Sequence, residues 1–259
     1  MPQPTLLTLS VASAIVLAAA VAQSLTGFGF ALVCVPLLVL VVAPLDSIPV
    51  SLILGAVMNI LALSARSLGT DRDARGQEPN RTKLDWWLVG GALCGIPLGS
   101  LVLARFDPGS LRLLVGITGA ISAIIIGSGR TWRIRRPRLV AVGVGLLSGV
   151  LNSSTSMGGV PVALFMANRR PGKHAFRDYL LLYILLVNLV AIAVFIASGL
   201  LAITGLRLSL LLAPAMLVGF ALGTWLFSRV STPLFTKISV SVVVLTSSVA
   251  VLTALIGRV

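Results

Sequence analysis

Two short polar stretches interrupt long apolar segments, and their residue types suit the binding of an anion. The first is QSLTGFGF at 23–30, and the second is NSSTSMGG at 152–159. Hydroxyl and amide groups donate hydrogen bonds, and glycine lets a ligand approach the backbone closely. In lipid, an irregular polar backbone is stable only where it lines a cavity or a ligand. We therefore expect the two stretches to form a binding site.

The apolar segments that follow these stretches start near Gly29 and Gly159 and are expected to be helices. The free N–H groups at the start of a helix, together with the helix dipole, favour an anion there. Two such helix starts that face each other would hold a small anion without a buried cation. The alternative interpretation is that these small residues only allow membrane helices to pack closely.

The anion hypothesis gives the candidate residues two roles, and it includes no metal ligand and no catalytic residue. We assign substrate contact to Thr26, Gly27, Gly29, Thr155, Ser156, Gly158 and Gly159. We assign the role of supporting donors to Gln23, Ser24, Asn59, Asn152, Ser153 and Asn188. Asn59 and Asn188 are each a lone amide inside an apolar segment, where a polar side chain needs a partner.

The chain repeats itself. A shift of 129 residues carries 23–30 onto 152–159 and Asn59 onto Asn188. A shift of 124 aligns GIPLGSLVLARF, which starts at Gly95, with GFALGTWLFSRV, which starts at Gly219. Both segments contain a GxxxG pair, for which helix–helix contact is the expected role. Weak internal symmetry of this kind is typical of secondary transporters.

The repeat divides the chain into three parts. Residues 1–128 form the first transmembrane repeat, 129–138 a basic cytoplasmic linker, and 139–259 the second transmembrane repeat. The composition agrees with a membrane protein, because 57% of the 259 residues are hydrophobic, only 10% are charged, and the mean hydropathy is +1.06. A soluble domain carries roughly a quarter charged residues. Apolar runs long enough to cross a bilayer, about 20 residues, recur along the chain.

The formal net charge of +13 does not indicate nucleic-acid binding. The basic residues lie in short loops between apolar segments, as the positive-inside rule expects. The partners that we expect are therefore the lipid bilayer and a small anionic substrate, with no nucleic acid. A homo-oligomer is compatible with the sequence.

The predicted fold is all-α, a polytopic helical membrane protein with two inverted repeats. Each repeat is a broken or re-entrant helix hairpin followed by three transmembrane helices, and this arrangement places most Lys and Arg on the cytoplasmic side. An odd number of crossings per repeat inverts the second repeat relative to the first. The N-terminus is then outside. The alternative is eight plain transmembrane helices in a 4+4 arrangement, and residues 5–45 leave open a hairpin or a single bent crossing.

Enzymatic activity is not expected. No HExxH motif, carboxylate pair or Ser/His/Asp set lies at membrane depth, and the chain has no Walker lysine motif. We expect no cofactor. The coupling ion is left open between proton and sodium, since no buried carboxylate offers an obvious proton relay.

The segments SLTGFGFALVCVPLL and SGVLNSSTSMGGVPVALFM, with the two GxxxG helices, resemble the TauE/SafE sulfite exporter family of membrane proteins. The resemblance covers nearly the whole chain. It implies efflux or uptake of sulfur-containing and related organic anions, such as sulfite or organosulfonates.

The sequence therefore predicts a secondary transporter that moves a small anion across a bacterial-type inner membrane by alternating access. The anion would lie between facing helix N-termini near the midplane. The alternatives are a passive anion channel and a membrane subunit that transports nothing itself. The sequence leaves the exact substrate, the direction of transport and the oligomeric state open.

Overall fold

A computed structural model describes residues 6–26, 29–67, 84–128, 137–169 and 173–227. Within these ranges the chain forms nine helices, which are α1 (Leu6–Thr26), α2 (Phe30–Val41), α3 (Pro44–Ser67), α4 (Trp86–Arg105), α5 (Pro108–Ser128), α6 (Pro137–Thr155), α7 (Gly159–Ala167), α8 (Lys173–Ala197) and α9 (Ile203–Phe227). Five of them, α1, α3, α4, α8 and α9, are long and apolar enough to cross a membrane. The prediction of a polytopic, all-helical membrane protein is confirmed.

Both polar stretches interrupt a helix at equivalent places. Helix α1 ends at Thr26 and α2 begins at Phe30, while α6 ends at Thr155 and α7 begins at Gly159. The shift of 129 residues maps the first break onto the second. The second break starts at Ser156, whose φ is +61°, and its N–H donates to Asn152 O at 2.8 Å. This left-handed residue with its bond back into the helix ends α6.

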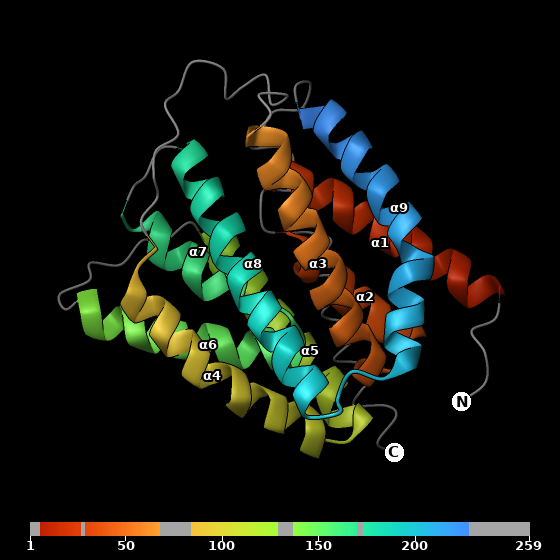
Figure 1. Ribbon diagram of the computed structural model, residues 1–259, viewed down its shortest axis with the longest axis horizontal. Helices are drawn as coiled ribbons and strands as arrows, with labels where there is room; N and C mark the ends of the chain where they lie inside the picture. Colours follow the sequence, from red (N-terminus) through yellow and green to blue (C-terminus); the bar gives the residue numbers. More distant parts are fainter. Residues whose placement is uncertain (1–5, 27–28, 68–83, 129–136, 170–172, 228–259) are drawn as a thin grey trace.

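Helices α3 and α8 are equivalent under the same shift and lie side by side in the middle of the molecule (Figure 1). They run in opposite directions, since α3 rises in the view of Figure 1 and α8 descends. Antiparallel equivalent helices fit the predicted inversion of one repeat relative to the other. Helix α2 packs against α1 and α3, and α7 packs against α6 and α8.

Each repeat also sends one helix across to the other repeat. Helix α4 packs along α6, and α9 packs along α1, so the two pairs flank the central helices in Figure 1. Gly95 of α4 lies against the backbone of Leu146, and Gly219 of α9 lies against Leu17. The shift of 129 maps Leu17 onto Leu146, so the two contacts are equivalent. Helix–helix contact, the expected role of the GxxxG pairs, is confirmed.

Two predicted parts of the chain fall outside the described residues. The first part is residues 129–136, which make up most of the basic linker. Helix α6 begins directly after them with Pro137, a favoured first residue of a helix. Adding 124 to the bounds of α5 places its counterpart at 232–252, which also lies there. The predicted boundaries of the two repeats therefore stay a prediction.

Candidate functional site

A cavity of about 20 Å³ lies where the two helix breaks meet, between α3 and α8. This is room for about one water molecule. Residues from both repeats line the cavity, namely Gln23, Phe30, Ala31, Leu32, Ser51, Gly55, Asn59, Ser156, Met157, Gly159, Val160, Ile184 and Asn188. Its polar groups are amides and hydroxyls, and no charged side chain is among these lining residues. Such a cavity can offer hydrogen bonds to a ligand without offering a counter-ion.

In the first repeat, the amide of Gln23 connects the start of α2 to Asn59 of α3. Phe30 N–H donates to Gln23 Oε1 at 3.2 Å, and Gln23 Nε2 donates to Asn59 Oδ1 at 2.6 Å. Asn59 is only 1% exposed. Its Nδ2 finds no hydrogen-bond acceptor among the described residues. An unsatisfied buried polar group costs about 1–3 kcal/mol, so this donor calls for a partner in the cavity.

The second repeat carries the equivalent pair. Asn152 Nδ2 donates to Asn188 Oδ1 at 3.0 Å, and the two residues are 36 positions apart, as are Gln23 and Asn59. Asn188 Nδ2 lies 3.5 Å from Leu52 O, at the outer limit of a hydrogen bond. The repeats therefore present the same group to the cavity from opposite sides, an amide nitrogen with spare donor capacity.

The lining near the asparagine amides also includes Ser51, Gly55 and Ser156. Ser156 Oγ donates to Ser51 Oγ at 3.2 Å, which links the second break to α3 of the first repeat. A Cβ at Gly55 would lie 3.3 Å from Asn188 Nδ2 and 3.8 Å from Phe30 Cδ1. Glycine at this position leaves the Asn188 amide its space.

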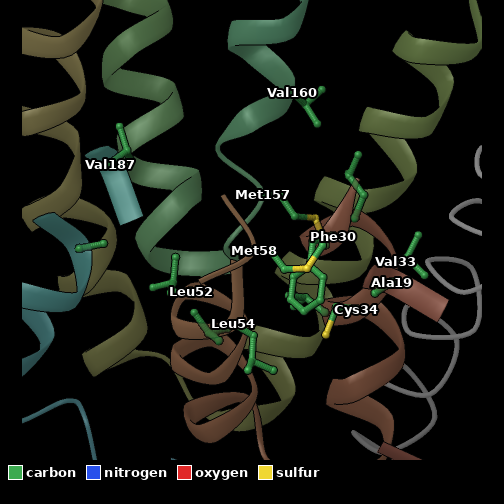
Figure 2. Close-up of a cluster of buried hydrophobic side chains, with 14 of the residues drawn as sticks. Ala19, Phe30, Val33, Cys34, Leu52, Leu54, Met58, Met157, Val160 and Val187 are labelled. Carbon is green, nitrogen blue, oxygen red and sulfur yellow. The ribbon is translucent and has the colours of Figure 1, made fainter. Parts of the chain in front are cut away.

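The rest of the cavity lining is apolar. Figure 2 shows Met157 of the second break close to Phe30 of the first hairpin, with Met58 of α3 beside them. Val160 and Ile184 add further aliphatic surface to the lining. A ligand in this cavity would therefore meet both amides and hydrocarbon.

A ladder of three hydroxyl residues, Ser148, Tyr183 and Tyr179, connects the second break to neighbouring helices. Ser148 Oγ donates to Gly158 O at 2.7 Å, and Tyr183 OH donates to Ser148 Oγ at 3.0 Å. The Tyr183 ring stacks on Tyr179, with 6.4 Å between the ring centroids. The Tyr179 hydroxyl accepts a hydrogen bond from Asp85 N–H at 3.3 Å. The ladder thus joins the break to the start of α4.

Five of the thirteen candidate residues line the cavity, namely Gln23, Asn59, Ser156, Gly159 and Asn188. Asn152 lies directly behind Asn188 and is bonded to it. Gly158 packs against Ser148 O and the Asn152 side chain, where a Cβ would clash. Gly29 is buried immediately before α2. The Thr26 side chain and Gly27 lie outside the described residues.

The remaining three candidates use their hydroxyls within or between helices. Ser24 Oγ donates to Ala20 O and, at 3.4 Å, to Phe220 O of α9. Ser153 Oγ donates to Gly149 O and to Ile96 O of α4, both at 2.8 Å. Thr155 Oγ1 donates to Leu151 O within its own helix. The structure thus uses these hydroxyls within α6 or at helix contacts, and none of the three residues is among the cavity lining.

Sequence reasoning missed several lining residues, and one signal could have found two of them. Ser51, Gly55 and Asn59 follow one another at intervals of four residues, so they lie on one face of α3. Because Asn59 was already a candidate, its helical spacing would have added Ser51 and Gly55, which share its face of α3. The apolar lining residues Phe30, Met157 and Ile184 carry no such signal, because they resemble any other core residue.

A family model for the sulfite exporter TauE/SafE family matches residues 12–250. The chain therefore belongs to this family, and the resemblance seen in the two glycine-containing segments is confirmed. Membership implies membrane transport of sulfur-containing anions. Comparisons with curated proteins and with solved structures gave no match.

Proposed function

We propose that this protein is a secondary transporter that holds a sulfur oxyanion or a small organosulfonate between its two helix breaks. The observation that carries the proposal is the Nδ2 of the buried Asn59, which has no partner among the described residues and belongs to a cavity shared by both repeats. Asn188 adds a second amide donor from the other repeat, with only a 3.5 Å contact to Leu52 O. Convergent neutral donors stabilise an anion while leaving it free to dissociate, as transport requires.

The mixed polar and apolar lining of the cavity suits an organosulfonate. The amides of Asn59 and Asn188 would bind the sulfonate oxygens, and Phe30 and Met157 would contact a short hydrocarbon tail. The cavity of about 20 Å³ is smaller than a sulfonate group. Binding therefore requires the two breaks to move apart, as conformational changes in an alternating-access cycle would allow.

The proposal includes a location and an orientation. We place the chain in a bacterial-type inner membrane as a multi-pass protein with its N-terminus outside. Alternating access would come from a rocking motion about the antiparallel α3–α8 pair. The chain has no proposed partner beyond the lipid bilayer, the substrate and a coupling ion. Proteoliposomes with an imposed proton or sodium gradient identify that ion.

Uptake by proteoliposomes tests the proposal. Purified protein should take up sulfite and short organosulfonates with saturation. Asn59→Leu and Asn188→Leu, which keep the side-chain volume and remove the amide, should each raise KM at least about tenfold, the equivalent of one charge-assisted hydrogen bond. Ser209→Ala is the control, because that buried hydroxyl donates only to Gly205 O of its own helix. Full uptake by folded protein with both asparagines replaced would contradict the proposed site.

A passive anion channel is separated from a carrier by counterflow. Vesicles loaded with unlabelled methanesulfonate should accumulate labelled methanesulfonate transiently above equilibrium if the protein is a carrier. A channel cannot show this accumulation. Movement of anions by the purified chain would also exclude a subunit that transports nothing itself.

A further inference from the structure

The acceptor atoms of the amides around the cavity are already occupied by the protein. A backbone N–H can only donate, so Phe30 N–H requires the oxygen of the Gln23 amide to face it. The nitrogen of that amide must then point to Asn59 and requires Oδ1 there. Asn59 Nδ2 is thereby turned away from Gln23 and has no acceptor in the part of the chain that the structure describes. One backbone N–H fixes the direction of both amides.

The second repeat has the same polarity. Asn152 Nδ2 donates to Asn188 Oδ1, which occupies that oxygen and leaves Asn188 Nδ2 on the cavity side. The two serine hydroxyls of the lining pair with each other, Ser156 donating to Ser51. Each asparagine amide therefore offers the cavity a hydrogen-bond donor, while its oxygen already accepts a bond from the protein.

From this polarity we infer that the site selects oxyanions that carry no proton of their own, and that Gln23 and Asn152 are the positioning residues for this selectivity. The inference rests on the transport function proposed above. All three oxygens of a sulfonate accept hydrogen bonds, as do those of fully deprotonated sulfite. A singly charged phosphonate carries one O–H that must donate, and the oxygens of both asparagine amides already accept a bond that holds them toward the protein. A buried polar group without a partner lowers affinity strongly.

A matched pair of ligands isolates this effect. Methanesulfonate and singly protonated methylphosphonate have nearly the same shape and the same charge, and they differ by one proton. Competition against the uptake of labelled ethanesulfonate, which carries no proton, is measured in proteoliposomes at a mildly acidic pH at which methylphosphonate is singly charged. The wild-type protein should prefer methanesulfonate by at least about tenfold, the usual effect of one unpaired polar group.

Two variants test the positioning role. Gln23→Met removes the amide that holds Asn59 Oδ1, so Asn59 can turn and offer this oxygen to a phosphonate O–H. Asn152→Leu does the same for Asn188. In each variant the preference for methanesulfonate should fall several-fold. A residue that only supports the fold would weaken the two ligands equally and leave their ratio unchanged, as the control Ser209→Ala should.

The outcomes separate this inference from the proposed function. Equal competition by both ligands in the wild-type protein would overturn the selectivity while leaving sulfonate transport in place. An unchanged ratio in both variants would overturn the positioning role in the same way. If the wild-type protein moves no sulfite or sulfonate at all, the proposed function fails, and the selectivity fails with it. Thermal unfolding in detergent verifies that each variant is folded, and the wild-type ratio needs no variant.

Discussion

Gly95 lies so close to Leu146 that a Cβ at Gly95 would overlap the Leu146 carbonyl oxygen. The two residues belong to different repeats, and the equivalent contact joins Gly219 to Leu17. The first arm of each broken hairpin is thus packed on a helix of the other repeat. If the protein rocks about the α3–α8 pair during transport, α1 should therefore move with α9, and α6 should move with α4. The closely packed glycine contacts would then be rigid joints, with the motion confined to the centre.

Gly95→Ala should therefore destabilise the protein, because the added methyl group meets backbone that cannot move aside. Overpacking of this kind costs about 1–3 kcal/mol. Gly90→Ala on the same helix is the matched control, since a Cβ there meets nothing within 4 Å. Thermal unfolding in detergent compares the two variants. Equal stability of Gly95→Ala and Gly90→Ala would show that the α4–α6 contact is not tight.

Gly55→Val should impair transport more than stability. The new side chain would enter the cavity lining, where even a Cβ lies 3.3 Å from Asn188 Nδ2. Because valine would displace the Asn188 amide, KM should rise or uptake should stop. The helix itself tolerates valine at a cost below about 1 kcal/mol. Gly143→Ala, on a face with nothing within 4 Å, serves as the control. Wild-type kinetics in Gly55→Val would remove Gly55 from the proposed site.

Ser156→Gly should separate stability from function. Ser156 has a φ of +61°, which costs a non-glycine residue about 1–2 kcal/mol, so glycine should raise the unfolding temperature. The same change removes the hydroxyl that donates to Ser51, so uptake should fall. The equivalent residue of the first break is a glycine, Gly27. Thermal unfolding and uptake are measured on the same variant. A higher unfolding temperature together with undiminished uptake would argue against a role for the hydroxyl in transport.

The duplication made much of this architecture predictable. Because Gln23 and Asn152 occupy equivalent positions, the sequence indicated that the two breaks would have the same form. The sequence did not indicate which polar residues near a break would face the cavity. Successive residues of a helix point about 100° apart, so Ser24 faces α9 while its neighbour Gln23 faces Asn59. Only the packing of the other repeat decides between these directions.

The bonding of the amides was also beyond the sequence. The pairing of Gln23 with Asn59 spans 36 residues and depends on how α3 approaches the break. The sequence grouped both residues as supporting donors. In the structure Gln23 orients the amide of Asn59, and Asn59 presents an Nδ2 donor that has no partner among the described residues. This difference arises because Phe30 N–H bonds to the oxygen of Gln23.

Ser148→Ala should loosen the second break. Ser148 Oγ donates to Gly158 O and accepts from Tyr183 OH, so its removal leaves two buried polar groups without their partner. We expect a loss of about 1–3 kcal/mol, whereas Tyr183→Phe, which keeps the bond to Gly158, should cost about 1 kcal/mol or less. The repeat-1 counterparts of Ser148 and Tyr183 are Ala19 and Leu54, so the ladder exists in one repeat only. Hydrogen exchange should accordingly speed up at residues 156–160 in Ser148→Ala and stay unchanged in α2. Equal effects on both hairpins, or a greater loss in Tyr183→Phe, would contradict a local role of the ladder.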